Sequence, residues 1–229
     1  MVTTEILKAV PLFSGLTPEL LDMLANHTTL QRHPRGAVVL QEGRLTDALY
    51  IMQSGRAKVF ESRSDGREVI LSIMGPGEFF GEMALIDDLP RSAGVETLEP
   101  CELMRISKPD FTRCLAESFE LTSRIMLALV NRLRRADRQI ESLALMDVYG
   151  RVARALLDMA KPVDGLRMIE HAPSQADIAR MVGASREMVS RVIKELKGSG
   201  HIQVNKRRIV LLDGLGSRQR PVATPGKKK

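Results

Sequence analysis

Short apolar runs separated by glycine turns dominate the sequence from Arg35 to about Ile106. The runs cover residues 37–40, 48–52, 57–60, 69–73 and 101–106. Asp65-Gly66 lies between two of them, and both residue types tolerate the backbone of a tight hairpin turn. Regularly spaced short strands joined in this way predict an antiparallel sandwich or barrel. Upstream, Thr17-Pro18 has the pattern of a helix N-cap followed by proline, so short helices are expected over residues 1–30.

A helical pattern follows from about residue 111 to residue 160, where the sequence has no proline and one glycine, Gly150. Apolar residues recur there at gaps of three and four: Met126, Leu129, Leu133, Ala136, Ile140 and Leu143. This is the a/d seam of a helix that pairs with another helix. A core helix packed within its own domain is the alternative interpretation. Polar and charged residues flank the stripe closely, which favours dimerisation through a helix over residues 111–145.

Two further helices are predicted around a glycine turn, over residues 174–181 and 185–197. Ser174 and Asp177 have the spacing of a capping box, and Gly183 suits the tight turn between the helices. The shared core would come from Ile178, Val189, Ile193 and Leu196. Residues 201–204 and 208–212 then predict a β-ribbon. The pattern is that of a winged helix-turn-helix.

The net charge of +6 is unevenly distributed along the 229 residues. Residues 1–160 carry a net charge of −3, residues 161–213 carry +4, and residues 214–229 carry +5. A basic C-terminal third on an acidic body indicates a polyanionic partner for that third. Aromatic residues are few and Trp is absent, which disfavours base stacking on single strands and leaves double-stranded DNA as the predicted partner.

Several classes of protein are disfavoured by the same sequence. No apolar run approaches the ~20 residues of a membrane span, and the N-terminus lacks the pattern of a signal peptide, so a cytoplasmic protein without membrane contact is expected. Cys101 and Cys114 cannot form a disulfide framework or a four-cysteine metal site. The histidines lack metal-ligand spacing, and no nucleophile–base motif indicates catalysis. We therefore expect no enzyme activity and no metal.

The second of the two paired helices presents candidate base-reading side chains. Arginine can contact guanine bidentately, and glutamate can accept from cytosine N4, which assigns base contacts to Arg186, Glu187 and Arg191. The alternative is a solvated helix face, because Glu187 and Arg191 also form an i,i+4 pair. Lys194 and Lys206 suit phosphates. The predicted DNA-binding set is completed by Ser174, Gln175, Ser185 and Ser190.

A second candidate site lies between Gly75 and Ala93. Gly81 permits close backbone approach, and a short helix beginning near Glu82 would direct amides at an anion. Arg91 and Ser92 can bind a phosphate through a guanidinium fork and a hydroxyl. Glu82 can accept from a ribose hydroxyl. Each pair alone is more often a turn or a surface feature, but their ordered combination within a β-sandwich is specific.

Together these motifs resemble the catabolite-activator/FNR (CRP/FNR) family of bacterial transcription regulators over residues 5–213. The resemblance rests on the cassette Phe80-Gly81-Glu82-Met83-Ala84-Leu85 followed by Pro90-Arg91-Ser92-Ala93, the long helix, and Ser185-Arg186-Glu187-Met188-Val189-Ser190-Arg191. It implies an α+β fold. A cyclic-nucleotide-binding β-roll (jelly roll) would span residues 1–110, the dimerisation helix 111–145, a winged helix-turn-helix DNA-binding domain 146–213, and a disordered basic tail 214–229.

The resemblance also implies roles for single residues. Glu82 would hold the ribose, Arg91 and Ser92 the cyclic phosphate, and Arg132 would brace Glu82. The implied ligand set is Gly81, Glu82, Met83, Ala84, Arg91, Ser92, Arg132, Ala136 and Asp137. Arg186, Glu187 and Arg191 would read a TGTGA-like half-site. Glu187, Ser190 and Arg191 also fit the FNR-type pattern, which leaves the exact operator open.

Two departures from the family pattern bear on the ligand. Residues 1–100 contain no Cys, which excludes the iron–sulfur cluster of the FNR branch. The Thr-Ser pair that contacts adenine in the catabolite-activator branch is replaced by Ala136 and Asp137. A carboxylate can accept from the N1–H and N2–H donors of guanine, so cyclic di-GMP or cGMP competes with cAMP as the predicted ligand. Alternatively, Asp137 pairs with an arginine one turn away.

The predicted function is therefore a homodimeric, ligand-gated transcription regulator that binds a cyclic nucleotide and a palindromic DNA site, with RNA polymerase as a further partner. Two alternatives remain at this point. The fold could carry a vestigial pocket and bind DNA without ligand, or it could be a cyclic-nucleotide-binding regulatory module that does not act on DNA.

Overall fold

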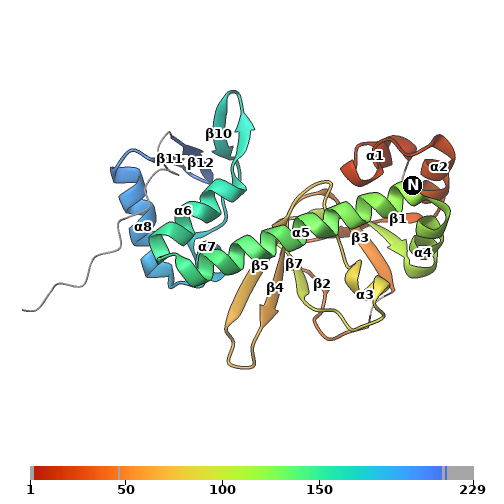
Figure 1. Cartoon of the computed structure of the whole chain (residues 1–229), viewed down its shortest axis with the longest axis horizontal. Helices are drawn as coiled ribbons and strands as arrows, with labels where there is room; N and C mark the ends of the chain where they lie inside the picture. Colours follow the sequence, from red (N-terminus) through yellow and green to blue (C-terminus); the bar gives the residue numbers. More distant parts are fainter. Residues whose placement is uncertain (1–2, 46, 213–214, 216–229) are drawn as a thin grey trace, which may run out of the picture. The chain divides into compact units, whose positions relative to one another are not determined.

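The computed structural model describes residues 3–45, 47–212 and 215. The chain divides into two compact units, Met1–Arg135 and Ala136–Lys229 (Figure 1). The boundary lies within helix α5. The predicted basic tail, residues 214–229, lies outside the described residues except for Leu215. Each unit is described below by itself.

The first unit contains most of the strands. Its elements are α1 (Thr4–Lys8), η1 (Pro11–Phe13), α2 (Pro18–Asn26), β1 (Thr28–His33), β2 (Val38–Leu40), β3 (Ala48–Ser54), β4 (Ala57–Ser62), β5 (Glu68–Met74), β6 (Phe79–Phe80), α3 (Met83–Ile86), β7 (Gly94–Thr97), β8 (Cys101–Ser107), α4 (Lys108–Glu117) and α5 (Phe119–Leu145), which continues into the second unit. The strands form two four-stranded antiparallel sheets, ordered β1-β8-β3-β6 and β2-β7-β4-β5. The β-roll that the sequence predicted is confirmed.

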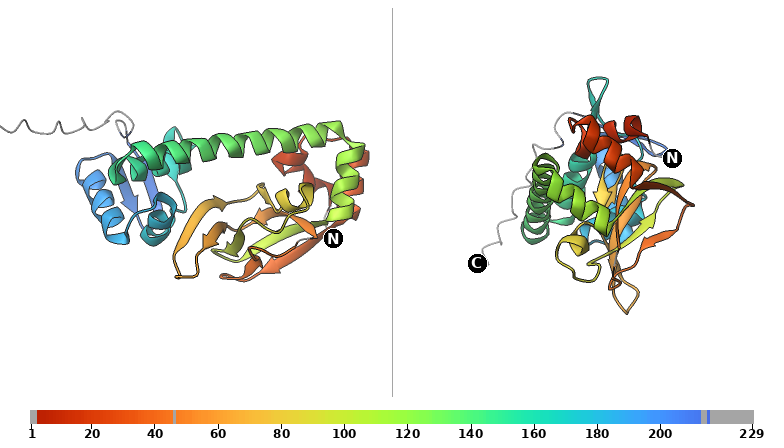
Figure 2. Two further views of the ribbon diagram at one scale, coloured as in Figure 1. Left: turned by 60° about the horizontal axis from the view of Figure 1, so that its bottom comes forward. Right: turned by 90° about the vertical axis from the view of Figure 1, so that its right-hand side faces the viewer.

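Side-chain alternation along the strands gives this unit two cores. One lies between the sheets and is built from Met52, Ala57, Met74, Phe80, Val95, Cys101 and Leu103. The other packs the opposite face of the β1-β8-β3-β6 sheet, with residues such as Ile51 and Met104, against the N-terminal helices, α4 and the first turns of α5 (Figure 2). The period of two along each strand explains how one sheet supplies both cores.

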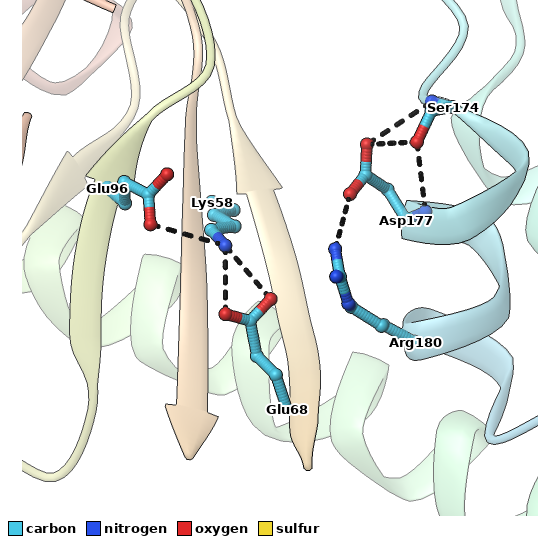
Figure 3. Close-up of polar contacts among 6 residues, drawn as sticks. All are labelled: Lys58, Glu68, Glu96, Ser174, Asp177 and Arg180. Carbon is cyan, nitrogen blue, oxygen red and sulfur yellow. Dashed lines mark hydrogen bonds and ion pairs between the residues drawn. The ribbon is translucent and has the colours of Figure 1, made fainter. Parts of the chain in front are cut away.

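The β4–β5 hairpin is closed by the predicted Asp65-Gly66 turn, in which Gly66 has a φ of 81°. Near the other end of β4, the ammonium of Lys58 is buried and lies 2.9 Å from Glu68 on β5 and 3.3 Å from Glu96 on β7 (Figure 3). A buried cation requires paired anions. Here the two strands on either side of β4, β5 and β7, provide one carboxylate each.

The predicted single helix over residues 111–145 is wrong, because α4 ends at Glu117 and α5 begins at Phe119. Ser118 has an extended backbone, and its hydroxyl accepts from the amide of Leu121, 3.1 Å away. The serine therefore caps the start of α5 while it ends α4. Strands β1, β6 and β7 were also missed in the sequence, and β1 begins before the predicted start of the strand region.

The second unit contains the predicted winged helix-turn-helix. Besides the end of α5, its elements are α6 (Val148–Met159), β9 (Lys161–Val163), β10 (Leu166–Ile169), α7 (Gln175–Val182), α8 (Arg186–Gly198), β11 (Ile202–Asn205) and β12 (Arg208–Leu211). Gly183 adopts the left-handed conformation with φ 61° between α7 and α8. The sheet order is β11-β12-β10-β9, so the ribbon is part of a four-stranded sheet. The β9–β10 hairpin, turned by Asp164-Gly165, was not predicted.

The core of the second unit confirms the predicted packing of the helix-turn-helix. Ile178, Val189, Ile193 and Leu196 are all buried, and they contact buried residues of α6 and of the sheet. Ala179 is buried at the α7 face, where a small side chain allows α8 to approach. The outward faces of both helices are thereby left mainly to polar side chains, with Met188 of α8 as an exposed apolar residue.

Candidate functional site

The phosphate cassette begins where β6 ends. Phe80 pairs with Tyr50 in the sheet, and the two rings stack with centroids 5.5 Å apart. Phe79 points to the opposite core from Phe80. Gly81 follows with a φ of +90°, and Glu82 precedes the short helix α3. The strand thus anchors the cassette through its two aromatic side chains, a role that the sequence motif alone did not assign to them.

Arg91 is a buried cation within the first unit. Its side chain belongs to a residue that is 5% exposed, and Nη2 donates to the carbonyl oxygen of Ala48 at 2.8 Å. Desolvation by burial lowers the pKa of the guanidinium from its usual value, and the charges of Tyr50 and Glu82 oppose this shift. A Cβ at Gly81 would fall on the Arg91 guanidinium. The absence of a side chain at Gly81 is therefore what admits Arg91.

Glu82 is 1% exposed and lies beside this cation. Its Oε1 accepts from Nη1 of Arg132 at 2.6 Å, and the same guanidinium donates to the Phe79 carbonyl and lies 4.6 Å from the Phe79 ring centroid. Its Oε2 has no hydrogen-bond partner among the residues that the structure describes. Buried polar atoms normally have partners. A ligand hydroxyl could donate a hydrogen bond to Oε2 of this carboxylate, and a ligand anion could pair with the Arg91 cation.

The remaining predicted ligand residues form no hydrogen bond or ion pair with the Glu82 carboxylate among the described residues. Ala84 is buried in α3, whereas Met83 and Ser92 are exposed, and the Ser92 hydroxyl lies 3.9 Å from the Met83 sulfur. Ala136 and Asp137 are exposed on α5 and fall in the second unit. Within the described residues Asp137 forms no ion pair, so the predicted alternative of a pair with a nearby arginine finds no support. Their part in the ligand site stays a prediction.

Helix α8 presents a polar face built from the predicted base-reading residues. Arg186, Glu187, Ser190, Arg191 and Lys194 are all exposed. Hydrogen bonds from the amide of Glu187 and from the Ser185 side chain lower the pKa of the Glu187 carboxyl, which is fully exposed. Throughout the described part of the chain, Glu187 and Arg191 form no ion pair. The exposed carboxylate and guanidinium are therefore both free of that pair and can meet base edges, and their assignment to base contacts stays a prediction.

Two of the other predicted DNA-binding residues, Ser174 and Ser185, also cap helices. The Ser174 hydroxyl accepts from the Asp177 amide at 3.1 Å and donates to the Asp177 carboxylate, which also contacts Arg180 (Figure 3). This confirms the predicted capping box. Ser185 caps α8 by accepting from the Met188 amide at 3.2 Å. Gln175 is half-buried in the first turn of α7.

The tip of the β11–β12 ribbon carries Lys206, which is exposed and has a φ of 51°. Asn205 pairs with Arg208 across the ribbon, so Lys206 and Arg207 form the turn. Arg207 donates to the Ala172 carbonyl at 3.3 Å, which ties the tip to the segment before α7. The exposed ammonium of Lys206 remains available for a phosphate.

Other functional chemistry finds little support in the described residues. Among them, no group of three or more His, Cys, Asp or Glu side chains is arranged to hold a metal ion. Cys101 and Cys114 are buried, and burial raises the pKa of the Cys114 thiol to about 11. Such thiols are poor nucleophiles at neutral pH. In the described part of the chain, no helix has the length and hydropathy needed to cross a membrane.

A β-roll with a buried arginine–glutamate cassette and a winged helix-turn-helix together define a class of DNA-binding transcription regulators. Residues 30–118 match the model of the cyclic nucleotide-binding domain, and residues 150–214 match the model of the Crp-like helix-turn-helix domain. The chain belongs to the CRP/FNR family of transcription regulators. It is accordingly a DNA-binding regulator and not an enzyme, as the sequence predicted.

The chain is similar to several individual members of that family. It is 32% identical over 213 residues to the CRP-like cAMP-activated global transcriptional regulator of Mycobacterium tuberculosis, covering 91% of this chain and 95% of the relative. It is 34% identical to the cyclic AMP receptor protein of Thermus thermophilus, covering 86% and 90%. The structure of the c-di-GMP responsive global regulator CLP of Xanthomonas campestris is similar with a TM-score of 0.70 and 29% identity, covering 85% and 99%.

Proposed function

We propose that this chain is a homodimeric regulator whose β-roll binds a cyclic nucleotide, and that binding controls recognition of a palindromic TGTGA-like DNA site by α8. The observation that carries the proposal is the pairing of a buried guanidinium, Arg91, with a buried carboxylate oxygen of Glu82 that lacks a donor among the described residues. A cyclic nucleotide offers both complements, because its phosphate is an anion and its ribose carries a hydroxyl.

Control of DNA binding requires that the ligand favour one arrangement of the protein over another. A ligand with equal affinity for two arrangements shifts neither population. Arg132 is the residue through which the ligand is proposed to act, since it connects Glu82 and the Phe79 carbonyl to α5. A change in the hydrogen bonds of Glu82 would therefore change the contact between Arg132 and the β-roll, and with it the contact of α5.

The homodimer is supported by the exposed apolar side chains of α5. Met126, Leu127, Val130, Leu133, Ile140 and Leu143 are all exposed in the single chain. Exposed apolar surface of this extent marks an interaction site, and the a/d spacing of the sequence suits a second copy of the same helix. Two copies of α8 would then face half-sites about one turn of DNA apart. RNA polymerase is the proposed further partner and the cytoplasm the proposed location, because a promoter-binding regulator meets the enzyme there.

The ligand is proposed to be cyclic di-GMP or cAMP, with cGMP as a further candidate. The relatives support both, since two are named for cAMP and one for c-di-GMP. The test is titration calorimetry with the three nucleotides, combined with fluorescence anisotropy on a TGTGA-type palindrome in the presence and absence of each. A cyclic nucleotide that binds and raises operator affinity supports the proposal. Equal operator affinity with and without every nucleotide would instead favour a vestigial site.

Asp137→Ala is expected to weaken binding of a guanine nucleotide about tenfold while leaving cAMP affinity unchanged, because the carboxylate can accept from guanine N1–H and N2–H. Calorimetry with cyclic di-GMP and cAMP measures both. Glu141→Ala is the matched control, as it removes an exposed carboxylate from the same helix. Equal losses for the two nucleotides, or for the two variants, would contradict a guanine-reading role.

Gly81→Ala is expected to reduce nucleotide affinity at least tenfold, because the added Cβ displaces the Arg91 guanidinium. Gly66→Ala provides the control: Gly66 also has a positive φ, of 81°, but its Cβ would meet no atom within 4 Å. Both variants should lose similar stability from backbone strain. Calorimetry should show the loss of affinity in Gly81→Ala alone, and an equal loss in both would refute the steric explanation.

A further inference from the structure

Met188 is an exposed apolar residue on a helix face that is otherwise polar. It is 44% exposed, and in the described chain no other large apolar side chain of α8 is exposed. The core-facing positions beside it are already filled by Val189 and Val192, which are buried. Met188 is therefore outside the core. It directly follows Glu187 in the sequence and lies one helical turn before Arg191.

The position of Met188 on the helix places it at the proposed DNA interface. Residues of an α-helix are 100° apart, so Arg186 and Met188 lie on opposite flanks of the exposed face that contains Glu187 and Arg191. Met188 is also in the first turn, since its amide donates to the capping hydroxyl of Ser185 at 3.2 Å. In helix-turn-helix proteins the N-terminal residues of the second helix contact base edges. Met188 shares that position with Arg186.

The chemistry of methionine limits what this side chain can recognise. A thioether donates no hydrogen bond and is a weak acceptor, so Met188 gains little from a phosphate oxygen or a polar base edge. The C5-methyl of thymine is the apolar feature of the major groove. Methionine is unbranched and polarizable, and it adapts to irregular apolar surfaces.

We propose that Met188 contacts the C5-methyl of one thymine in each half-site, and that it thereby selects a T·A pair at that position. This assignment rests on the proposed recognition of DNA by α8. It adds an apolar specificity determinant to the polar ones, Arg186, Glu187 and Arg191. Those three residues contact hydrogen-bonding groups of the bases, whereas Met188 contacts a methyl group, which forms no hydrogen bond.

The test replaces thymine by uracil, which lacks the C5-methyl and keeps every hydrogen-bonding group. Each thymine of the TGTGA-type palindrome is replaced in turn, symmetrically in both half-sites, and the dissociation constant of the nucleotide-saturated protein is measured by fluorescence anisotropy. At one position, replacing thymine by uracil should lower the affinity of the unmodified protein about fourfold per half-site. This is the size expected for burying one methyl-sized group. Met188→Ala should bind the thymine duplex as weakly as the unmodified protein binds the uracil duplex. Its affinity should not fall further when uracil replaces thymine.

Leu166→Ala is the matched control, because Leu166 is 48% exposed on β10 of the same unit and should leave the uracil effect unchanged. Uracil effects of equal size in the unmodified protein and in Met188→Ala would overturn the assignment, as would their absence at every position. If the unmodified protein binds the palindrome no better than a scrambled duplex, DNA recognition by α8 fails and the Met188 assignment fails with it.

Discussion

Arg91→Gln is expected to weaken nucleotide binding by about 100-fold or more, or about 3 kcal/mol. The guanidinium is buried, and its desolvation is offset in the complex by the ligand phosphate, so the variant loses a charge-assisted contact in a site from which water is excluded. Glutamine is polar but uncharged, so the substitution removes the cation while leaving a hydrogen-bond donor on the side chain. Calorimetry on the purified protein measures the change in affinity.

The stability of the Arg91→Gln protein separates a binding role from a structural one. Removing the buried cation relieves its desolvation but also removes its attraction to Glu82, which keeps its ion pair with Arg132, so the ligand-free variant should unfold at about the same temperature as the unmodified protein. A ligand present at 100 times its dissociation constant stabilises the unmodified protein by about 2.7 kcal/mol, and this shift should vanish in the variant. Arg32→Gln, at an exposed arginine paired with Glu102, is the control and should retain the shift. A variant that simply unfolds at lower temperature would contradict the assignment.

Arg191→Ala is expected to weaken operator binding by between about 30-fold and about 25,000-fold. One bidentate contact to a base is worth about 1–3 kcal/mol, and in a homodimer the substitution removes it from both half-sites. Anisotropy on the palindrome and on a scrambled duplex at several salt concentrations measures the effect. Affinity for the scrambled duplex should change little, because base contacts carry sequence information and phosphate contacts do not.

Arg154→Ala supplies the matched control for the charge, since Arg154 is half-buried on α6 of the same unit and lies 3.5 Å from Asp158. It removes the same formal charge without touching α8. Equal losses on operator and scrambled DNA in Arg191→Ala, with a salt slope reduced by about two (about one for each protomer), would assign Arg191 to a phosphate instead of a base. That result would leave Arg186 and Glu187 as the base readers.

Local rules explain why much of the fold was predictable. Asp65-Gly66 turned its hairpin, the Ser174–Asp177 capping box formed, and Gly183 took the left-handed conformation between two helices. Each depends on residues within four positions of one another, so tertiary contacts do not override them. The break at Ser118 was missed because a serine within a helical pattern is a weak signal, and its capping bond to Leu121 becomes visible once the backbone is known. The β9–β10 hairpin also has an Asp-Gly turn, Asp164-Gly165, in which both residues have a positive φ.

The candidate ligand site shows a similar division. The cassette from Gly81 to Ser92 is a local motif, and its residue types alone indicated a phosphate and a ribose. The glutamate–arginine contact joins residues 50 positions apart, which depends on how α5 packs on the sheet. The same holds for Arg91 and the Ala48 carbonyl, 43 positions apart.

The amino-acid pattern thus specified the order of the two kinds of domain, most of their elements and the two candidate sites of this regulator, because turn chemistry, capping and hydrophobic period act over a few residues. Tertiary packing decided which of those residues are buried together. It buried Glu82 with one oxygen lacking a partner among the described residues, and it placed Tyr50 against Phe80. It also left Met188 exposed beside the proposed base readers. Burial and long-range contact arise from the summed packing of the whole unit, which no short stretch of sequence contains.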